Sequence, residues 1–505
     1  MKNSFRGHKI VSAFKQHESY DQNAVMEIRE LADQAFSRAT GAPLIEGNQV
    51  RLLKDAHENY SAWLDAIHSA KSYIHFESYI IYEDIAGREF ADALIEKAKQ
   101  GVRVSLMYDW LGALRKTSRR FWNRLRQANI NVRCFNPPRL DSPLGWFSRD
   151  HRKMLVIDGQ IGFITGLCIG RKWQGIPEKK IDPWRDTGVE VRGPAVADID
   201  RSFAHVWAMT GDPLPYQEII NTEIPRAGEM NVRVVATTPA TAGMFRLDQL
   251  VTALARKRVW LTDAYYLGTT SYVQALRAAA QDGVEVCMLV PSGTDIPILK
   301  LLSRSGYRTL LEAGVRVFEW NGTMLHAKSA VIDGRWARVG STNLNIASWL
   351  GNCELDLVIE NEEFAAAMEQ MYIQDLKNAT EIVLHGKRKT RAVKKRGSRT
   401  RPFTASGSGR VGRAAAGALR IGHTVGAAFT GRRVLEPVEA RLMTIAGLIL
   451  LAISILFAFF PQGLAYPLLL IFAWLGFALL YQSLKLYREG KNSDQGKRRK
   501  RKSKT

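Results

Sequence analysis

The strongest constraint on this chain is a short pattern, His-x-Lys-x4-Asp-Gly, that occurs twice. The copies are His151, Lys153 and Asp158 in the first half, and His326, Lys328 and Asp333 in the second. Equivalent residues are 175 positions apart in all three cases. A duplicated pattern with a constant offset predicts two similar halves, each presenting one imidazole and one ammonium group. Two such pairs can converge on one phosphate, so phosphodiester chemistry is the leading hypothesis.

The residues around each copy are typical of a buried strand that ends in a turn. Side chains two positions apart on a strand point to the same side, so His151 and Lys153 share a face if this segment is extended. The apolar runs 154–157 and 330–332 fit buried strands, and the Asp-Gly pair after each run fits a turn. Each half is therefore expected to present its histidine and lysine together at a sheet edge or end.

The repeat extends beyond the pattern itself. Residues 74–79 parallel 259–265, residues 101–107 parallel 283–289, and residues 128–133 parallel 313–318. Segments with the apolar spacing of a helix lie between them. Alternating strands and helices predict an α/β fold. We expect two similar αβα sandwich lobes, related by a pseudo-twofold axis, with one active site at their interface.

These features resemble the phospholipase D superfamily, and more closely the bacterial cardiolipin synthases within it. The resemblance covers residues 41–385 and includes the stretches 47–53, 184–191 and 348–354. It implies two phospholipase D-like lobes. The doubled motif is specific for the superfamily. It does not single out the cardiolipin synthases, because nucleases and phospholipases share the same core. The family pattern often has Asn where this chain has Cys168, so Asn343 would supply that amide alone.

Residue chemistry and the resemblance together give the candidates their roles. Lys153 and Lys328 can neutralise the non-bridging phosphate oxygens, and Asn343 can donate an amide hydrogen bond. One histidine would attack phosphorus, while the other protonates the leaving alcohol and then deprotonates the incoming one. The resemblance assigns His151 as nucleophile and His326 as acid/base. The sequence leaves the reverse order open.

Further candidates come from the same resemblance. Asp186 and Glu354 are the carboxylates expected to fix the tautomers of the two histidines, and Ser341 is a second substrate-binding candidate. Asp158 and Asp333 complete the candidate catalytic set, although their Asp-Gly context favours bracing of the loops over contact with substrate. No metal or cofactor is expected, because the lysines supply the positive charge.

The identity of the second alcohol separates the possible activities. If a phosphatidylglycerol hydroxyl enters, the enzyme is a phosphatidyltransferase that forms cardiolipin, which is the reading that the resemblance implies. If water enters, it is a phospholipase D-type hydrolase. A nuclease of the same superfamily is a third possibility, because it would use the same histidines. A scaffold with an inactive site is disfavoured, because both His-Lys pairs are intact.

The C-terminal part predicts a membrane anchor. Residues 442–460 and 464–481 contain no charged residue, and each run is about long enough to cross a bilayer. The intervening Pro461-Gln-Gly463 would close a transmembrane hairpin. A pair of buried helices or a re-entrant hairpin remains the alternative.

The charge of the chain is concentrated beside this hairpin. Of the net +22, residues 386–434 contribute fourteen Lys/Arg without an acidic residue, and residues 491–505 contribute +7. Basic flanks on both sides place the catalytic domain and both termini in the cytoplasm, at a bacterial inner membrane. Such clusters attract anionic phospholipids, or the phosphates of nucleic acid, and the adjacent hairpin favours the membrane. No nucleic-acid partner is therefore expected.

The rest of the sequence lacks two common signals and indicates where the segments of the chain begin and end. The N-terminus has no apolar segment typical of a signal peptide, and the four cysteines show no CxxC spacing. The expected segments are an extension (1–40), a first lobe (41–211), a linker (212–230), a second lobe (231–385), a basic linker (386–440), the hairpin (441–484) and a basic tail (485–505).

Overall fold

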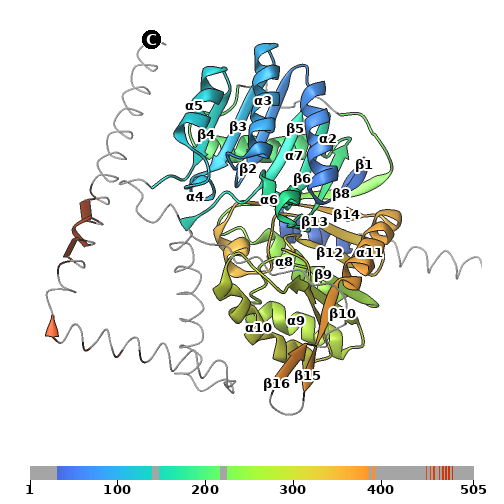
Figure 1. Ribbon diagram of the computed structural model, residues 1–505. Coiled ribbons are helices and arrows are strands. Elements are labelled where there is room, and N and C mark those ends of the chain that lie inside the picture. Colours follow the sequence, from blue (N-terminus) through green and yellow to red (C-terminus); the bar gives the residue numbers. More distant parts are fainter. Residues whose placement is uncertain are drawn as a thin grey trace, which may run out of the picture. The chain divides into compact units, whose positions relative to one another are not determined.

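The computed structural model describes residues 31–138, 147–215, 224–385 and 389–392, with scattered positions between 448 and 480. The chain divides into two compact units, and both motif copies lie in the unit formed by residues 1–108, 112–133 and 150–404. Strands and helices alternate through this unit around one mixed sheet (Figure 1). The α/β fold class expected from the alternating pattern is confirmed.

The first part of the sheet has the strand order β1-β7-β6-β5-β2-β3-β4. Its strands are β1 (Ile45–Lys54), β2 (Tyr73–Ser78), β3 (Arg103–Asp109), β4 (Asn131–Phe135), β5 (Lys153–Ile157), β6 (Ile161–Thr165) and β7 (Thr187–Arg192). Its helices are α2 (Asp55–Ser69), α3 (Ile85–Lys99), α4 (Trp110–Ala113), α5 (Arg119–Gln127), α6 (Arg171–Gln174) and α7 (Val196–Met209), with a 3-10 turn at Pro177–Lys179.

The second part of the sheet has the order β8-β14-β13-β12-β9-β10-β11. Its strands are β8 (Met230–Thr237), β9 (Arg258–Thr262), β10 (Glu285–Pro291), β11 (Arg316–Trp320), β12 (Ser329–Ile332), β13 (Trp336–Gly340) and β14 (Glu354–Glu360). Its helices are α8 (Gly243–Leu254), α9 (Thr270–Gln281), α10 (Pro297–Leu311) and α11 (Glu362–Lys377), with a π-helical turn at Ala347–Gly351. Strands β15 (Ala379–His385) and β16 (Lys389–Ala392) extend the edge beyond β11.

The two strand orders are the same. Each strand of the first part corresponds to the strand with a label seven higher in the second part. The parts join where β1 and β8 pair antiparallel, through Ile45 with Val232 and Asn48 with Met230. The duplication seen as a 175-residue offset is therefore a duplication of strand topology.

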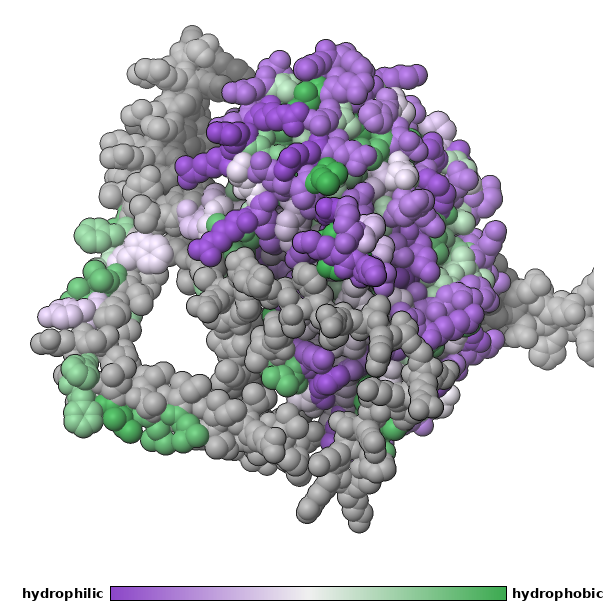
Figure 2. All heavy atoms as spheres, viewed as in Figure 1, coloured by the Kyte–Doolittle hydropathy of each residue, from purple (hydrophilic) through white to green (hydrophobic). Residues whose placement is uncertain are grey.

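Helices cover both faces of the sheet. On β2, Phe76 packs against Trp63 of α2, whereas its neighbour His75 stacks on Phe203 of α7 at 4.7 Å. Since consecutive strand residues point to opposite faces, α2 and α7 cover opposite sides. In the second part, Trp260 of β9 stacks on α11, and the next residue belongs to the core shared with α8 and α9. Figure 1 shows α2 and α3 side by side, and Figure 2 shows a mostly hydrophilic outer surface over them.

Each motif strand ends in a tight turn. Asp158 and Gly159 both have positive φ, +52° and +66°, and the pair that follows β12 has nearly the same values. Two consecutive positive φ angles define a type I′ turn, whose twist matches that of the flanking antiparallel strands. The Asp-Gly pairs therefore form the predicted turns, which close the hairpins β5–β6 and β12–β13.

Most of the hairpin expected at 441–484 lies outside the described residues, as do most of the basic linker and the basic tail. Among the residues that the structure does describe, no helix combines the length and the apolar character needed to cross a membrane.

Candidate active site

Each motif histidine is held by a carboxylate from the other half of the sheet. His151 Nδ1 lies 2.9 Å and 3.0 Å from the two carboxylate oxygens of Glu354. His326 Nδ1 lies 2.7 Å from Asp186 Oδ2. These are the two carboxylates to which the family resemblance assigned this role. A carboxylate on Nδ1 leaves Nε2 as the ring atom that can attack or exchange a proton.

Backbone hydrogen bonds lock the same crossed arrangement. The amide of His151 donates to the carbonyl of Cys353 at 2.9 Å, directly before Glu354. The amide of His326 donates to the carbonyl of Arg185 at 2.7 Å, directly before Asp186. Each histidine and its carboxylate are thus fixed as neighbouring residues on two paired segments. The distance between them does not depend on side-chain rotamers alone.

The motif lysines lie on the same side as their histidines, as the strand spacing predicted. The ammonium group of Lys153 contacts the carbonyl oxygen of His151. Lys328 Nζ lies 2.9 Å and 3.2 Å from the ring nitrogens of His326 and also contacts its carbonyl oxygen. All four side chains are buried. Two cations with little access to water are suited to neutralising an anionic substrate.

Burial and neighbouring charges lower the pKa of both histidines. Burial is the main cause for His151, with Lys153 adding to it and Glu354 opposing it. For His326, burial and Lys328 together lower the pKa to about 4, against the effect of Asp186. Both rings are therefore neutral at neutral pH before an anionic substrate binds. Neutral imidazole is the form that can act as a nucleophile.

The orienting carboxylates are ionised and held by further donors. Burial alone would raise the pKa of Asp186, but His326 and Lys328 lower it. Trp173 Nε1 donates to Asp186 Oδ2 at 3.0 Å. A Cβ atom at position 166 would lie 2.2 Å from Asp186 Oδ1, so glycine is required at Gly166 for this approach.

Glu354 has an equivalent set of donors. Burial would raise its pKa, but His151 and Lys153 lower it, with a hydrogen bond from Ser341. Ser341 Oγ donates to Glu354 Oε2 at 2.6 Å, and Asn352 Nδ2 lies 3.3 Å from Oε1. Ser341 was expected to bind substrate. In the structure its hydroxyl contacts the carboxylate that orients His151.

The motif aspartates make backbone contacts away from the histidine rings. The carboxylate of Asp158 accepts the amides of residues 71–73 at 2.7–2.8 Å, and Asp333 accepts those of residues 256–258 at 2.8 Å. These contacts tie each type I′ turn to the start of the neighbouring strand, β2 or β9. This geometry supports the bracing role that the turn context favoured.

The candidate amide and its cysteine counterpart are both buried. Asn343 Nδ2 lies 3.5 Å from Ser348 Oγ, and Asn343 Oδ1 has no hydrogen-bond partner within the described part of the chain. Cys168 lies in the electric field of Lys153 and Lys328, which opposes the rise in thiol pKa caused by burial. Position 168 therefore lies close to the cations, where an asparagine would add a second amide.

Aromatic residues around the histidines were not found from the sequence. Tyr79 packs edge-on against His151 at 5.0 Å, and Tyr265 packs edge-on against His326 at 5.8 Å. Trp173 and Trp184 also lie against His326, at 5.5 Å and 5.7 Å. Each tyrosine follows the corresponding strand, β2 or β9, with a shift of one position between the halves, which was an available signal. Trp184 begins one of the stretches that carry the resemblance, whereas Trp173 had no signal, because its partner is distant in the sequence.

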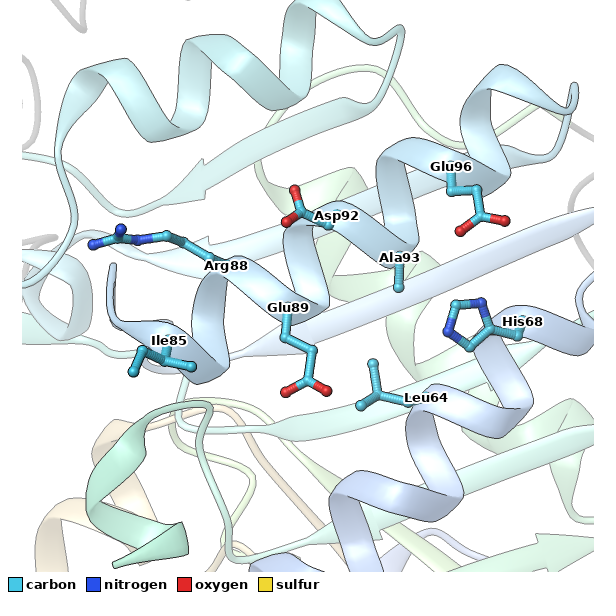
Figure 3. A pocket seen from close by; sticks show the side chains of 8 residues that line it. All are labelled: Leu64, His68, Ile85, Arg88, Glu89, Asp92, Ala93 and Glu96. Atoms are coloured by element: carbon cyan, nitrogen blue, oxygen red, sulfur yellow. The ribbon is translucent and has the colours of Figure 1, made fainter. Parts of the chain in front are cut away.

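A surface groove elsewhere is separate from this chemistry. Figure 3 shows it between α2 and α3, lined by Leu64, His68, Ile85, Arg88, Glu89, Asp92, Ala93 and Glu96. None of these residues belongs to the motif or its partners. No group of three or more His, Cys, Asp or Glu residues able to hold a metal ion occurs among the described residues.

Comparison with protein families and curated sequences gives a consistent result. A family model described as "Cardiolipin synthase, PLD-like domain" matches residues 63–207 and 251–376. The cardiolipin synthase of Alkalihalophilus pseudofirmus is 32% identical over 347 residues, which is 67% of this chain and 68% of the relative. Cardiolipin synthase A of Pseudomonas aeruginosa is 32% identical over 372 residues, or 72% and 74% of the two chains.

Solved structures support the fold. The crystal structure of phosphatidylserine synthase from Haemophilus influenzae matches 69% of this chain and 91% of that chain, with a TM-score of 0.54. Sequence identity to it is 15%, so the likeness concerns the fold alone.

Proposed function

Because the chain belongs to the cardiolipin synthase family with a phospholipase D-like domain, we propose that it forms cardiolipin from phosphatidylglycerol, or from a related phosphatidyl donor and acceptor. Family membership makes the protein a phosphatidyltransferase. The observation that carries the mechanism is the crossed pairing of His151 with Glu354 and of His326 with Asp186.

The first half-reaction breaks the bond between phosphorus and the leaving alcohol. Nε2 of His151 attacks phosphorus, while Lys153 and Lys328 neutralise the non-bridging oxygens. The bound phosphodiester adds a negative charge beside His326, which raises the pKa of that ring toward the range where it carries a proton. His326 gives this proton to the departing glycerol oxygen. The product is a phosphatidyl-histidine at His151.

The second half-reaction reverses these steps with a new alcohol. The acceptor hydroxyl loses its proton to His326 and bonds to phosphorus, and the bond between phosphorus and His151 breaks. Glu354 and Asp186 hold the two tautomers throughout, because each accepts from Nδ1 of its histidine. Water as acceptor would give phosphatidic acid. The alcohol that reaches the site therefore decides between transfer and hydrolysis.

The central test is a lipid assay. Purified protein is given phosphatidylglycerol in mixed micelles, and the products are resolved by mass spectrometry, with His151→Ala alongside. We expect cardiolipin and glycerol in equal amounts, and neither from the variant. Phosphatidic acid as the main product would assign a hydrolase. Cleavage of DNA in the absence of lipid, with no lipid product, would assign a nuclease.

Lys328 gives the activity an alkaline limit. Burial lowers its pKa to about 8, with Lys153 contributing. The ammonium form is needed to neutralise the phosphate, and this form is lost as pH rises through the pKa. Above about pH 8 we therefore expect kcat/KM, which reports the free enzyme, to fall by a further factor of about ten per pH unit, beyond the slope set by protonation of His326. In Lys328→Arg, whose guanidinium stays charged, any residual activity should lack this limb. An unchanged limb would assign it to another group.

We further propose that the two similar parts of the sheet are two lobes sharing one active site, and that the C-terminal apolar runs anchor them to the bacterial inner membrane. The described side chains between 448 and 480 include exposed Leu448, Phe459 and Phe477. Exposed apolar groups at this density are typical of a membrane or protein contact. Retention of the full chain in membranes after alkaline carbonate washing is expected. Release into the wash would exclude an integral anchor.

A further inference from the structure

Two lysines outside the doubled motif flank one aromatic ring. Lys116 Nζ lies 5.5 Å from the centroid of the Tyr82 ring, and Lys172 Nζ lies 5.4 Å from it. Lys116 follows α4 and Lys172 lies on α6, so the two cations beside the ring come from separate segments of the chain. Both lysines are half-buried, so their charges are partly removed from bulk water. The attraction of each ammonium to the ring helps to hold both charges beside Tyr82.

The ring itself is fixed by its surroundings. The amide of Tyr82 donates to the carbonyl of Ile169 at 2.9 Å. A Cβ atom at position 170 would lie 2.5 Å from Cδ2 of the ring, so Gly170 allows the ring to pack directly on the backbone. Position 170 lies just beyond Cys168, in the segment that flanks the first motif. The ring is therefore held from the same segment as the catalytic face.

This pair of lysines is connected to the active site through tryptophan. Lys172 Nζ lies 5.6 Å from the Trp184 ring, and that ring lies 5.7 Å from the ring of His326. The sum of these two distances is an upper limit on the separation between the Lys172 ammonium and the ring of His326, the acid/base residue. Lys116 also acts on the thiol of Cys168, lowering its pKa against the dominant effect of burial. Lys172 is thus linked to His326 through one tryptophan ring, and Lys116 shares the Tyr82 ring with Lys172, while neither lysine belongs to the motif.

The proposed reaction brings a second negative charge into the site, which the motif lysines do not neutralise. Transfer to phosphatidylglycerol requires two phosphodiesters in the site at once, one in the donor and one in the acceptor. Lys153 and Lys328 neutralise the donor phosphate. The acceptor phosphate also loses water as it enters, and a second anion beside the first is repelled unless cations offset it.

We propose that Lys116, Lys172 and Tyr82 form the subsite for the phosphate of the acceptor lipid. This inference rests on the proposed phosphatidyltransferase function and names the group that selects an anionic acceptor. When the acceptor hydroxyl oxygen bonds to phosphorus, the bond from phosphorus to His151 breaks and the hydroxyl proton passes to His326. The acceptor phosphate stays unchanged on the two lysines during this step.

The length of the acceptor headgroup fits this arrangement. Six bonds separate the two phosphorus atoms that a glycerol bridges, which is roughly 7 Å, since three bonds of backbone span about 3.8 Å. This length lies within the limit set by the two steps from Lys172 through Trp184 to His326. Burial and the nearby acidic residue Asp295 raise the pKa of the Tyr82 hydroxyl. The Asp295 carboxylate accepts a hydrogen bond from the Tyr265 hydroxyl at 2.8 Å, so it has a donor besides the two lysines.

A competition assay tests the subsite. Phosphatidylglycerol micelles are supplied with ethanol, so that the same phosphatidyl-enzyme is divided between an anionic and a neutral acceptor. The ratio of cardiolipin to phosphatidylethanol measures acceptor choice alone. We expect Lys116→Gln and Lys172→Gln each to lower this ratio about tenfold, the effect of losing one charge-assisted contact. Single-turnover release of glycerol, which reports the first half-reaction, is measured alongside, so that slower formation of the phosphatidyl-enzyme is distinguished from a change in acceptor choice.

Matched variants make the result specific. Lys179→Gln removes the same charge from an exposed position in the segment that follows Lys172, and its ratio should equal that of the wild type. An unchanged ratio in the Lys116/Lys172 double variant would overturn the subsite, as would an equal fall in Lys179→Gln. Absence of glycerol release from the wild type would instead overturn the proposed function.

Discussion

Replacing His326 with alanine is expected to lower the rate of cardiolipin formation by up to about 10⁴-fold, because the glycerol oxygen must then leave without a proton. The ring lies 2.7 Å from Asp186 Oδ2 and packs among aromatic side chains, which together hold it in the position from which it donates. Steady-state rates measured with phosphatidylglycerol micelles provide the test. A His326→Ala enzyme with full turnover would remove the shared-site model.

A second substrate separates the two histidine roles. A phosphatidyl ester of p-nitrophenol has a leaving group that needs no proton. With this ester, His326→Ala should release about one equivalent of nitrophenolate and then stall as the phosphatidyl-enzyme, since nothing deprotonates the acceptor. His151→Ala should give no such burst, because it lacks the nucleophile. The reverse pattern would exchange the roles of the two histidines, which the sequence left open.

Replacing Asp375 with alanine is expected to lower the free energy of unfolding by about 3–5 kcal/mol, because it leaves a buried cation without its main partner. Arg185 is 4% exposed, and its guanidinium binds both carboxylate oxygens of Asp375 at 2.8–3.0 Å. A further contact, to Asp55 Oδ1, is 3.2 Å long. Chemical denaturation followed by tryptophan fluorescence gives the measurement.

The same change should slow catalysis in the folded enzyme. The carbonyl of Arg185 accepts the amide of His326, so movement of Arg185 moves the crossed pair. Lys54 provides the control, because its ammonium is 4.0 Å from Asp375 and its side chain is 43% exposed. Lys54→Ala should change stability by less than about 1 kcal/mol.

A double variant completes the cycle. Arg185→Met with Asp375→Leu removes both charges and should recover most of the lost stability, since the uncompensated charge is the cause. Recovery of stability without recovery of the rate would assign the guanidinium a positioning role as well. Equal stability of Asp375→Ala and the wild type would refute the buried-clamp interpretation.

The sequence determined the elements that depend on local pattern. The two motif strands, their Asp-Gly turns and the shared face of each histidine and lysine follow from the period of two along a strand and from the positive φ that the turn needs. Duplication at a fixed offset also predicted the repeated order of strands. Asp186 and Glu354 were found only because the chain resembles a known family. Spacing along the chain contains no information about which histidine each would meet.

What only the tertiary structure decided is the set of contacts between the two parts of the sheet. The crossing of His151 to Glu354 and of His326 to Asp186, the place of Ser341 on Glu354, and the tryptophans around His326 all join residues distant in sequence. Contacts of this kind depend on how strands pair and how far two paired segments slide, and no periodicity in the chain specifies either. The sequence thus determined the local geometry, whereas long-range packing determined the partner of each catalytic group.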